Sequence, residues 1–334
     1  MVKLVPPGRD PADSEPPRLF ANADIVTLDP SRPHARSLVV HAGRIVALCD
    51  DPWPDPGPGV RRTDCGGATL VPGFIDAHMH LLGWARTLGD PGFGTAASIG
   101  QLQQALHAIA IARPAGTWIT GQGYDEHRLG RHPTRQDLDA GAPADPVNVL
   151  PPPGRAQVPN TLALHRLGIT ASSGDIDGGL IDREPSSGEP TGLLFGMQRF
   201  VAARIPRRDA AAADARIAQA GRRLLGCGIT SLLDTSPGND LPRLAALRRW
   251  RQDGLLQTRI AAVLGWDAFA ALDAPGLAAL AADPAVRLGG VKLTIQDLTG
   301  RQQPDDDELA HRVARIHACG LQAVMHAVHP PAIE

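Results

Sequence analysis

The chain has 334 residues, of which 43% are hydrophobic, and its formal net charge is −2. This length and composition are typical of a globular protein of one or two domains with a substantial core. The balanced charge argues against a nucleic-acid or membrane-surface partner, and no apolar run approaches the ~20 residues of a membrane span. No signal peptide is recognisable and the four cysteines are scattered, so we expect a cytoplasmic protein with free thiols.

The N-terminal part of the sequence has the pattern of a small β module. Residues 1–17 are rich in proline and poor in apolar residues, which predicts a disordered tail. The segments 18–29 and 37–50 predict short strands, and a tight turn at 41–44 indicates a hairpin. We therefore predict that residues 18–72 form the N-terminal β-sandwich portion of a composite domain.

From residue 73 the sequence changes to strands that alternate with helices. Strands separated by helices of this length predict right-handed βαβ units and a parallel sheet. We predict an α/β fold for residues 73–334, a (β/α)8 TIM-type barrel that is incomplete, with about five βα units. The predicted strands cover 73–80, 229–234, 258–264, 290–295 and 321–328, and the predicted helices cover 208–225, 241–252, 268–282 and 305–318.

Residues 85–205 are too many for one crossover between the first two strands, so we predict an insertion there. It should contain a helix near 98–112, strands near 117–121 and 146–150, and loops at 171–192 that are rich in Gly, Asp and Pro. Insertions after barrel strands often shape substrate pockets.

The sequence GFIDAHMH ends the first predicted parallel strand with two histidines. Side chains two residues apart on a strand share a face, so Asp76, His78 and His80 should project together. Two imidazoles on one face can chelate one divalent ion, for which zinc is the usual choice. A bare H-x-H is more often a pair of solvent-facing residues, but the carboxyl end of a barrel strand favours a site. We expect Asp76 to orient a ligand rather than to take part in catalysis.

Polar residues in two further predicted strands are also candidates for a metal site. Lys292 lies in the middle of an apolar strand and should point inward, where an ammonium is costly unless it is paired or neutralised. Carbamylation beside divalent metals would convert this amine into a bridging carboxylate; the alternative is a salt-bridged or snorkelling lysine. His326 lies near the end of the last strand and His329 at the turn after it, and either could be an ordinary polar residue.

These motifs resemble the metal-dependent amidohydrolases, and most of all amidohydrolase family 3, which contains YtcJ-like proteins and N-substituted formamide deformylases. The resemblance spans most of the chain. It rests on the segments NADIVTLD, HAGRIVAL, LVPGFIDAHMHLLG, GYDEHRLGRHPTRQDLD, LGIT, DGGLIDRE, GEPTGLL, GITSLLD, GVKL and MHAV.

The resemblance implies that His78, His80, Lys292 and His326 are metal ligands. It also implies one or two divalent ions, zinc above all, and a carbamylated Lys292. The family's sixth-strand histidine and eighth-strand aspartate have no counterpart among five strands, so we expect a chain truncated after the fifth barrel strand and assign no catalytic residue. The segment PPPGRAQVPN, residues 151–160, also departs from the polar, histidine-bearing segment of relatives.

The implied function is hydrolysis of non-peptide carbon–nitrogen bonds, of the amide or formamide type, by metal-activated water. The partner would be a small-molecule amide-type substrate, without nucleic acid or membrane, and the sequence is compatible with a homo-oligomer. Two alternatives stay open. One is a catalytically silent, truncated amidohydrolase-like protein with a binding role, and the other is a phosphotriesterase-like metal hydrolase.

Overall fold

The computed structural model describes residues 15–152, 156–174, 176, 179–206, 210–283, 285–295 and 303–327. The chain divides into two compact units, Met1–Phe74 and Ile75–Glu334, and each is described here by itself. Most of the predicted tail, residues 1–14, lies outside the described residues. None of the described helices combines the length and the apolar character needed to cross a bilayer.

The first unit is built from short strands in small sheets, one in the order β5-β4-β1-β6 and another in the order β3-β2-β7. The predicted hairpin is confirmed, because β4 and β5 pair antiparallel. Its turn has positive φ at Ala42 (49°) and Gly43 (71°), as a two-residue hairpin turn requires. The strands are β1 (Arg18–Ala21), β2 (Asp24–Val26), β3 (His34–Ala35), β4 (Ser37–His41), β5 (Arg44–Cys49), β6 (Arg61–Asp64) and β7 (Thr69–Leu70).

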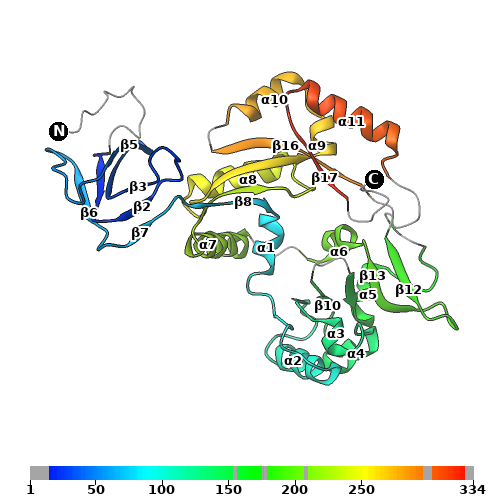
Figure 1. Cartoon of the computed structure of the whole chain (residues 1–334). Helices are drawn as coiled ribbons and strands as arrows, with labels where there is room; N and C mark the ends of the chain where they lie inside the picture. Colours follow the sequence, from blue (N-terminus) through cyan, green and yellow to red (C-terminus); the bar gives the residue numbers. More distant parts are fainter. Residues whose placement is uncertain are drawn as a thin grey trace. The chain divides into compact units, whose positions relative to one another are not determined.

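The second unit contains a curled parallel sheet of the half-barrel type, with the strand order β17-β16-β15-β14-β8 (Figure 1). Each of the pairs β14–β15, β15–β16 and β16–β17 is parallel, as predicted. The first and last of these strands in the sequence, β8 and β17, therefore form the two edges of the sheet. The strands are β8 (Phe74–Met79), β14 (Ile229–Asp234), β15 (Arg259–Gly265), β16 (Val286–Thr294) and β17 (Ala323–His326).

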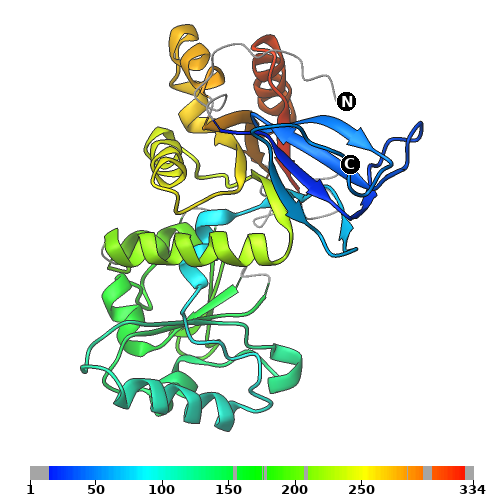
Figure 2. The same ribbon diagram turned by 90° about the vertical axis from the view of Figure 1, so that its left-hand side faces the viewer.

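Helices follow these strands and bury their apolar faces against the sheet. Leu224, Leu247 and Ile316 from three of these helices belong to one buried cluster with Leu232 and Val291 from the strands. In Figure 2, α7 is the long yellow-green helix beside α1, and its Arg216 donates a hydrogen bond to the carbonyl oxygen of Arg86 at 2.5 Å. The helices are α1 (Leu81–Thr87), α7 (Ala210–Gly226), α8 (Leu241–Gln252), α9 (Trp266–Ala270), α10 (Ala274–Ala281) and α11 (Asp306–Ala318).

One predicted helix is wrong in detail. The segment 268–282 does not form a single helix, because α9 ends at Ala270 and α10 begins at Ala274. Asp273 accepts a hydrogen bond from the N–H of Gly276 as an N-cap, and Pro275 lies in the first turn of α10. A capping aspartate followed by proline is typical of a helix start. The apolar periodicity of the sequence therefore continues across an interruption between two helices.

The insertion forms a second sheet, in the order β12-β13-β11-β10-β9. The predicted helix and strands are confirmed, but the prediction of loops throughout 171–192 is wrong. Here β12 pairs antiparallel with β13, whose first residues also lie in that range. Glycine and proline around these strands are typical of loops, and the pairing of β13 with the distant strand β11 is not visible in the local sequence. The elements are α2 (Ile99–Ile111), β9 (Ile119–Gln122), α3 (Glu126–Leu129), α4 (Arg135–Gly141), β10 (Val147–Leu150), β11 (Ala156–Pro159), α5 (Thr161–Leu167), β12 (Leu180–Arg183), β13 (Pro190–Phe195) and α6 (Gln198–Arg204).

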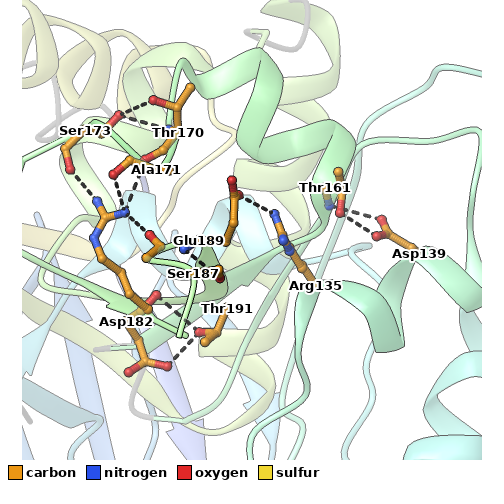
Figure 3. A network of polar contacts seen from close by, with 12 residues as sticks. Arg135, Asp139, Thr161, Thr170, Ala171, Ser173, Asp182, Ser187, Glu189 and Thr191 are labelled. Carbon is orange, nitrogen blue, oxygen red and sulfur yellow. Dashed lines mark hydrogen bonds and ion pairs between the residues drawn. The ribbon is translucent and has the colours of Figure 1, made fainter. Parts of the chain in front are cut away.

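The motifs of the insertion meet in a network of polar contacts (Figure 3). The Arg183 guanidinium donates to the carbonyl oxygens of Gly188 at 2.8 Å, Ala171 at 3.1 Å and Thr170 at 3.3 Å, and also to that of Ser173. One side chain therefore joins the end of the LGIT segment to the turn between β12 and β13.

Three side-chain pairs extend this arrangement to the remaining motif segments. The Thr191 hydroxyl donates to Asp182 Oδ2 at 2.7 Å, and Arg135 contacts Glu189 at 3.4 Å (Figure 3). The Thr161 hydroxyl donates to Asp139 Oδ2 at 2.5 Å. These contacts show that the polar residues of the insertion motifs hold its own segments together.

Candidate metal site at the strand ends

Two histidines lie side by side at the edge of the parallel sheet, His78 in β8 and His80 directly after it, at the N-cap of α1. The ring centroids of His78 and His80 are 5.5 Å apart, and their planes meet at 83°. Asp76 does not join them as a third side chain, because its Oδ1 accepts the backbone N–H of His78 at 3.1 Å. Its carboxylate therefore holds the backbone of the strand at His78, and its expected role in orienting a ligand stays a prediction.

Lys292 lies inside the sheet, on β16, with only 2% of its surface exposed. Its register partners are Gly265 on β15 and Val324 on β17. Within the part of the chain that the structure describes, its Nζ has no hydrogen-bond partner. Burial lowers the pKa of this amine from its ordinary value near 10.5. Neither a snorkelling nor a salt-bridged lysine matches this environment.

Asp234, the last residue of β14, was not singled out from the sequence. It is fully buried; its Oδ1 accepts the N–H of Ser236 at 2.9 Å, and its Oδ2 has no partner among the described residues. The available signal was its place at the carboxyl end of the apolar segment ITSLLD. What the sequence does not contain is the proximity of this strand end to β8.

The pKa of His80 depends on charged groups from other strands of the sheet. Burial lowers its pKa from 6.5, the Asp234 carboxylate raises it, and His78 and Lys292 lower it further, with a lowered pKa as the net result. His80 is therefore neutral at pH 7, so it has a nitrogen lone pair that could bind a cation. Its neighbourhood combines side chains from β8, β14 and β16.

His326 lies at the end of β17, on the opposite edge of the sheet from β8. It pairs in register with Thr294, two residues beyond the pairing of Val324 with Lys292, so its side chain is on the same face as Lys292. His329 lies outside the described residues. Among the described residues, no group of three or more His, Cys, Asp or Glu side chains is close enough together to hold a metal ion.

The donor chemistry of the strand ends nevertheless fits a divalent cation. Two adjacent imidazoles are available at the end of β8, and a buried carboxylate oxygen and a buried amine have no partner among the residues described. Unpaired buried polar atoms cost free energy, and a bound cation would give the amine a partner after its carbamylation and would balance the charge of the Asp234 carboxylate.

Parts of the chain are similar in sequence to known proteins. The chain is 30% identical over 198 residues to protein LONG AFTER FAR-RED 3 of Arabidopsis thaliana, a match that covers 58% of this chain and 33% of the relative. It is 31% identical over 183 residues to N-substituted formamide deformylase of Arthrobacter pascens, covering 53% of this chain and 34% of the relative. The chain therefore spans about a third of the length of these two relatives.

A solved structure has the same fold. It is that of an uncharacterized metal-dependent hydrolase from Pyrococcus horikoshii OT3, with a TM-score of 0.67, 22% sequence identity, and coverage of 95% of this chain and 66% of that one. The model of the amidohydrolase family, Amidohydro_3, matches residues 62–334, which is well over half of the chain. The chain belongs to the amidohydrolase family.

Proposed function

We propose that the protein is a metal-dependent hydrolase that acts on non-peptide carbon–nitrogen bonds of the amide or formamide type. The observation that carries this proposal is the buried amine of Lys292, which has no partner in the described structure. Its charge lowers the pKa of His80, so the two side chains are close enough to interact. Membership of the amidohydrolase family and the similarity to a formamide deformylase support the choice of bond.

In this proposal His78, His80, Lys292 and His326 hold one or two divalent ions, with zinc as the first choice for nitrogen ligands. His80 can contribute because its lowered pKa keeps the imidazole neutral at pH 7. Zinc, when bound, supplies a hydroxide at neutral pH and polarises the substrate carbonyl. The five strands would be the first part of a (β/α)8 barrel, and the first unit would be part of a β-sandwich.

The lowered pKa of Lys292 has its own chemical consequence. A larger neutral fraction makes its amine a better nucleophile toward carbon dioxide. The amine nitrogen forms a bond to the carbon, one C–O π bond becomes an oxygen lone pair, and one N–H proton goes to solvent. The product is a carbamate, whose negative charge would be balanced by the cation instead of remaining unpaired inside the sheet.

We infer that the substrate is a small amide and that the reaction takes place in the cytoplasm. All four cysteines are free thiols, as is usual in a reducing compartment. The test is a hydrolysis screen with added zinc and bicarbonate over amides, formamides, lactams, carboxylic esters and phosphotriesters, with the double variant H78A/H80A as the blank.

Turnover of an amide or formamide that H78A/H80A lacks would support the proposal. Turnover confined to phosphotriesters or carboxylic esters would contradict the proposed bond type. Stoichiometric zinc without turnover of any of these compounds would favour the binding protein over the enzyme.

A further inference from the structure

We propose that Asp234 is a positioning residue of the metal site, whose Oδ2 accepts the ring N–H of His80 and so fixes which imidazole nitrogen faces the metal. The inference rests on the proposed metal site and assigns a role within it to a residue of the neighbouring strand. Three features of the structure carry it: the hydrogen bonds between the ends of β14 and β8, the carboxylate oxygen that is bonded to the backbone, and the second carboxylate oxygen, which has no partner among the described residues.

The backbone holds the two residues next to each other. The N–H of Thr235, the residue after Asp234, donates to the carbonyl oxygen of Met79, the residue before His80, at 2.8 Å. The Thr235 hydroxyl contacts the same oxygen at 3.3 Å. Two hydrogen bonds on one acceptor thus join the carboxyl ends of β14 and β8 at the residues in question.

The carboxylate of Asp234 is held from one side only. Its Oδ1 accepts the N–H of Ser236 at 2.9 Å, whereas Oδ2 has no partner among the described residues although the residue is fully buried. A buried carboxylate oxygen without a hydrogen bond is costly, so a donor is expected there in the working protein.

The loop after β14 prevents the carboxylate from swinging away to find another donor. Asn239 in this loop accepts the N–H of Gly265 on its backbone oxygen at 2.8 Å, and its side chain donates to the carbonyl oxygen of Val263 at 3.0 Å. The loop is therefore fixed to the end of β15, and the Asp234 side chain stays beside β8.

Two nearby groups could donate to this oxygen, and the structure favours His80. The two hydrogen bonds from Thr235 to Met79 place Asp234 and His80 in neighbouring positions on the two chain segments, whereas Lys292 lies on β16, which is separated from β14 by β15. Metal-binding histidines commonly donate their second ring N–H to a carboxylate, which selects the tautomer and makes the other nitrogen a better ligand.

The test compares the unsubstituted chain with D234N and D234A. Asp145 offers a matched control, because it is also buried and its Oδ1 also accepts one backbone N–H, that of Gly116 at 2.7 Å. Zinc affinity is measured by competition with a chelator, and the ring nitrogens are observed by imidazole 15N–1H NMR of the zinc-loaded protein, with His80 assigned through H80Q.

We expect zinc binding to weaken about 10–100-fold in D234A and less in D234N, with no change in D145N. A downfield ring N–H resonance of His80 should be present in the unsubstituted chain and in D145N, and absent from D234A. If D234A does not fold, the near-isosteric D234N provides the same readouts.

Zinc affinity and a His80 N–H resonance that are unchanged in D234A and D234N would overturn this inference and leave the proposed function intact. Equal weakening in D145N would also overturn it, because the effect would then be a general loss of stability. Failure of the unsubstituted chain to bind zinc would overturn the proposed metal site, and the inference with it.

Discussion

Polar side chains of the insertion and of the parallel sheet are used in opposite ways. In the insertion, Arg183 donates to four carbonyl oxygens, and Asp182 and Glu189 have side-chain partners. At the strand ends, Lys292 and Asp234 each bury an atom that lacks a partner in the described structure. A satisfied network maintains a fold, whereas unsatisfied buried groups indicate a place where a ligand completes the structure.

The insertion motifs that carry part of the family resemblance are therefore not the residues that could hold a metal ion. The insertion motifs contribute much of the resemblance to amidohydrolase family 3, yet their polar contacts are made within the insertion itself (Figure 3). Two buried amides of the insertion are exceptions to this contrast. Asn148 and Gln157 each leave one atom without a partner in the described structure, but they bond to each other at 3.4 Å. Changes in the two regions should therefore have separable effects.

The largest effect is expected from H78A/H80A, which should abolish stoichiometric zinc binding because it removes the adjacent pair of imidazoles. Metal analysis after dialysis of the purified variant measures this. The control is H107A, since His107 is an exposed histidine on α2. Stoichiometric zinc in the double variant would show that β8 does not carry the site.

Replacing Arg183 should lower the stability of the fold and leave zinc binding unchanged. R183Q removes the donor that several carbonyl oxygens share, so we expect the free energy of unfolding to fall by about 1–3 kcal/mol while zinc content per folded molecule stays the same. Chemical denaturation and metal analysis of the same sample measure both quantities. Loss of zinc from folded R183Q would mean that the two regions are not independent.

For K292M we expect the effect on stability, relative to the unsubstituted chain, to have opposite signs in the metal-free and the metal-loaded protein. Methionine has a similar length without a buried amine, so the metal-free variant should be more stable than the unsubstituted chain by about 1–2 kcal/mol. With zinc and bicarbonate present, the variant should instead lose the stabilisation that the metal confers. Thermal unfolding under both conditions measures this, and a metal-free K292M that is less stable would show that the amine has a partner.

The smallest effect is expected at Asp137 in the insertion. Burial raises the pKa of this carboxyl, but hydrogen bonds from Arg131 and Thr134 outweigh burial and leave the pKa lowered from 3.8. A lowered pKa means that the ionised form stabilises the fold above pH 3.8, and that this contribution disappears as the pH falls through the pKa of the folded state.

D137N should therefore be less stable than the unsubstituted chain by about 1 kcal/mol at pH 7, because Asp137 also completes the capping box of α4. The difference should shrink as the pH falls below 3.8. Denaturation of both proteins across the acid range measures it, and a difference that does not depend on pH would assign the effect to packing instead of charge.

Local patterns in the sequence were sufficient for the elements of the parallel sheet. The segment ITSLLD matches β14 and the segment Leu241–Gln252 matches α8, because each element has its own apolar periodicity and boundary residues. The same local reading located His78, His80 and Lys292. It did not find the hairpin of β12 and β13, because the glycine and proline around these strands are typical of loops. It also did not find the place of Asp234 beside His80, because that depends on a contact between segments distant in the sequence.

The attachment of the loop after β14 to Gly265 limits how this protein can diversify. A Cβ at Gly265 would lie 2.2 Å from the backbone oxygen of Pro237, so no other residue fits there without moving the loop. Insertions, deletions or bulky replacements in this loop would displace the buried carboxylate at its start. For the proposed hydrolase, variants that accept new substrates should therefore arise from changes elsewhere, and libraries aimed at new specificity should leave residues 235–240 and Gly265 untouched.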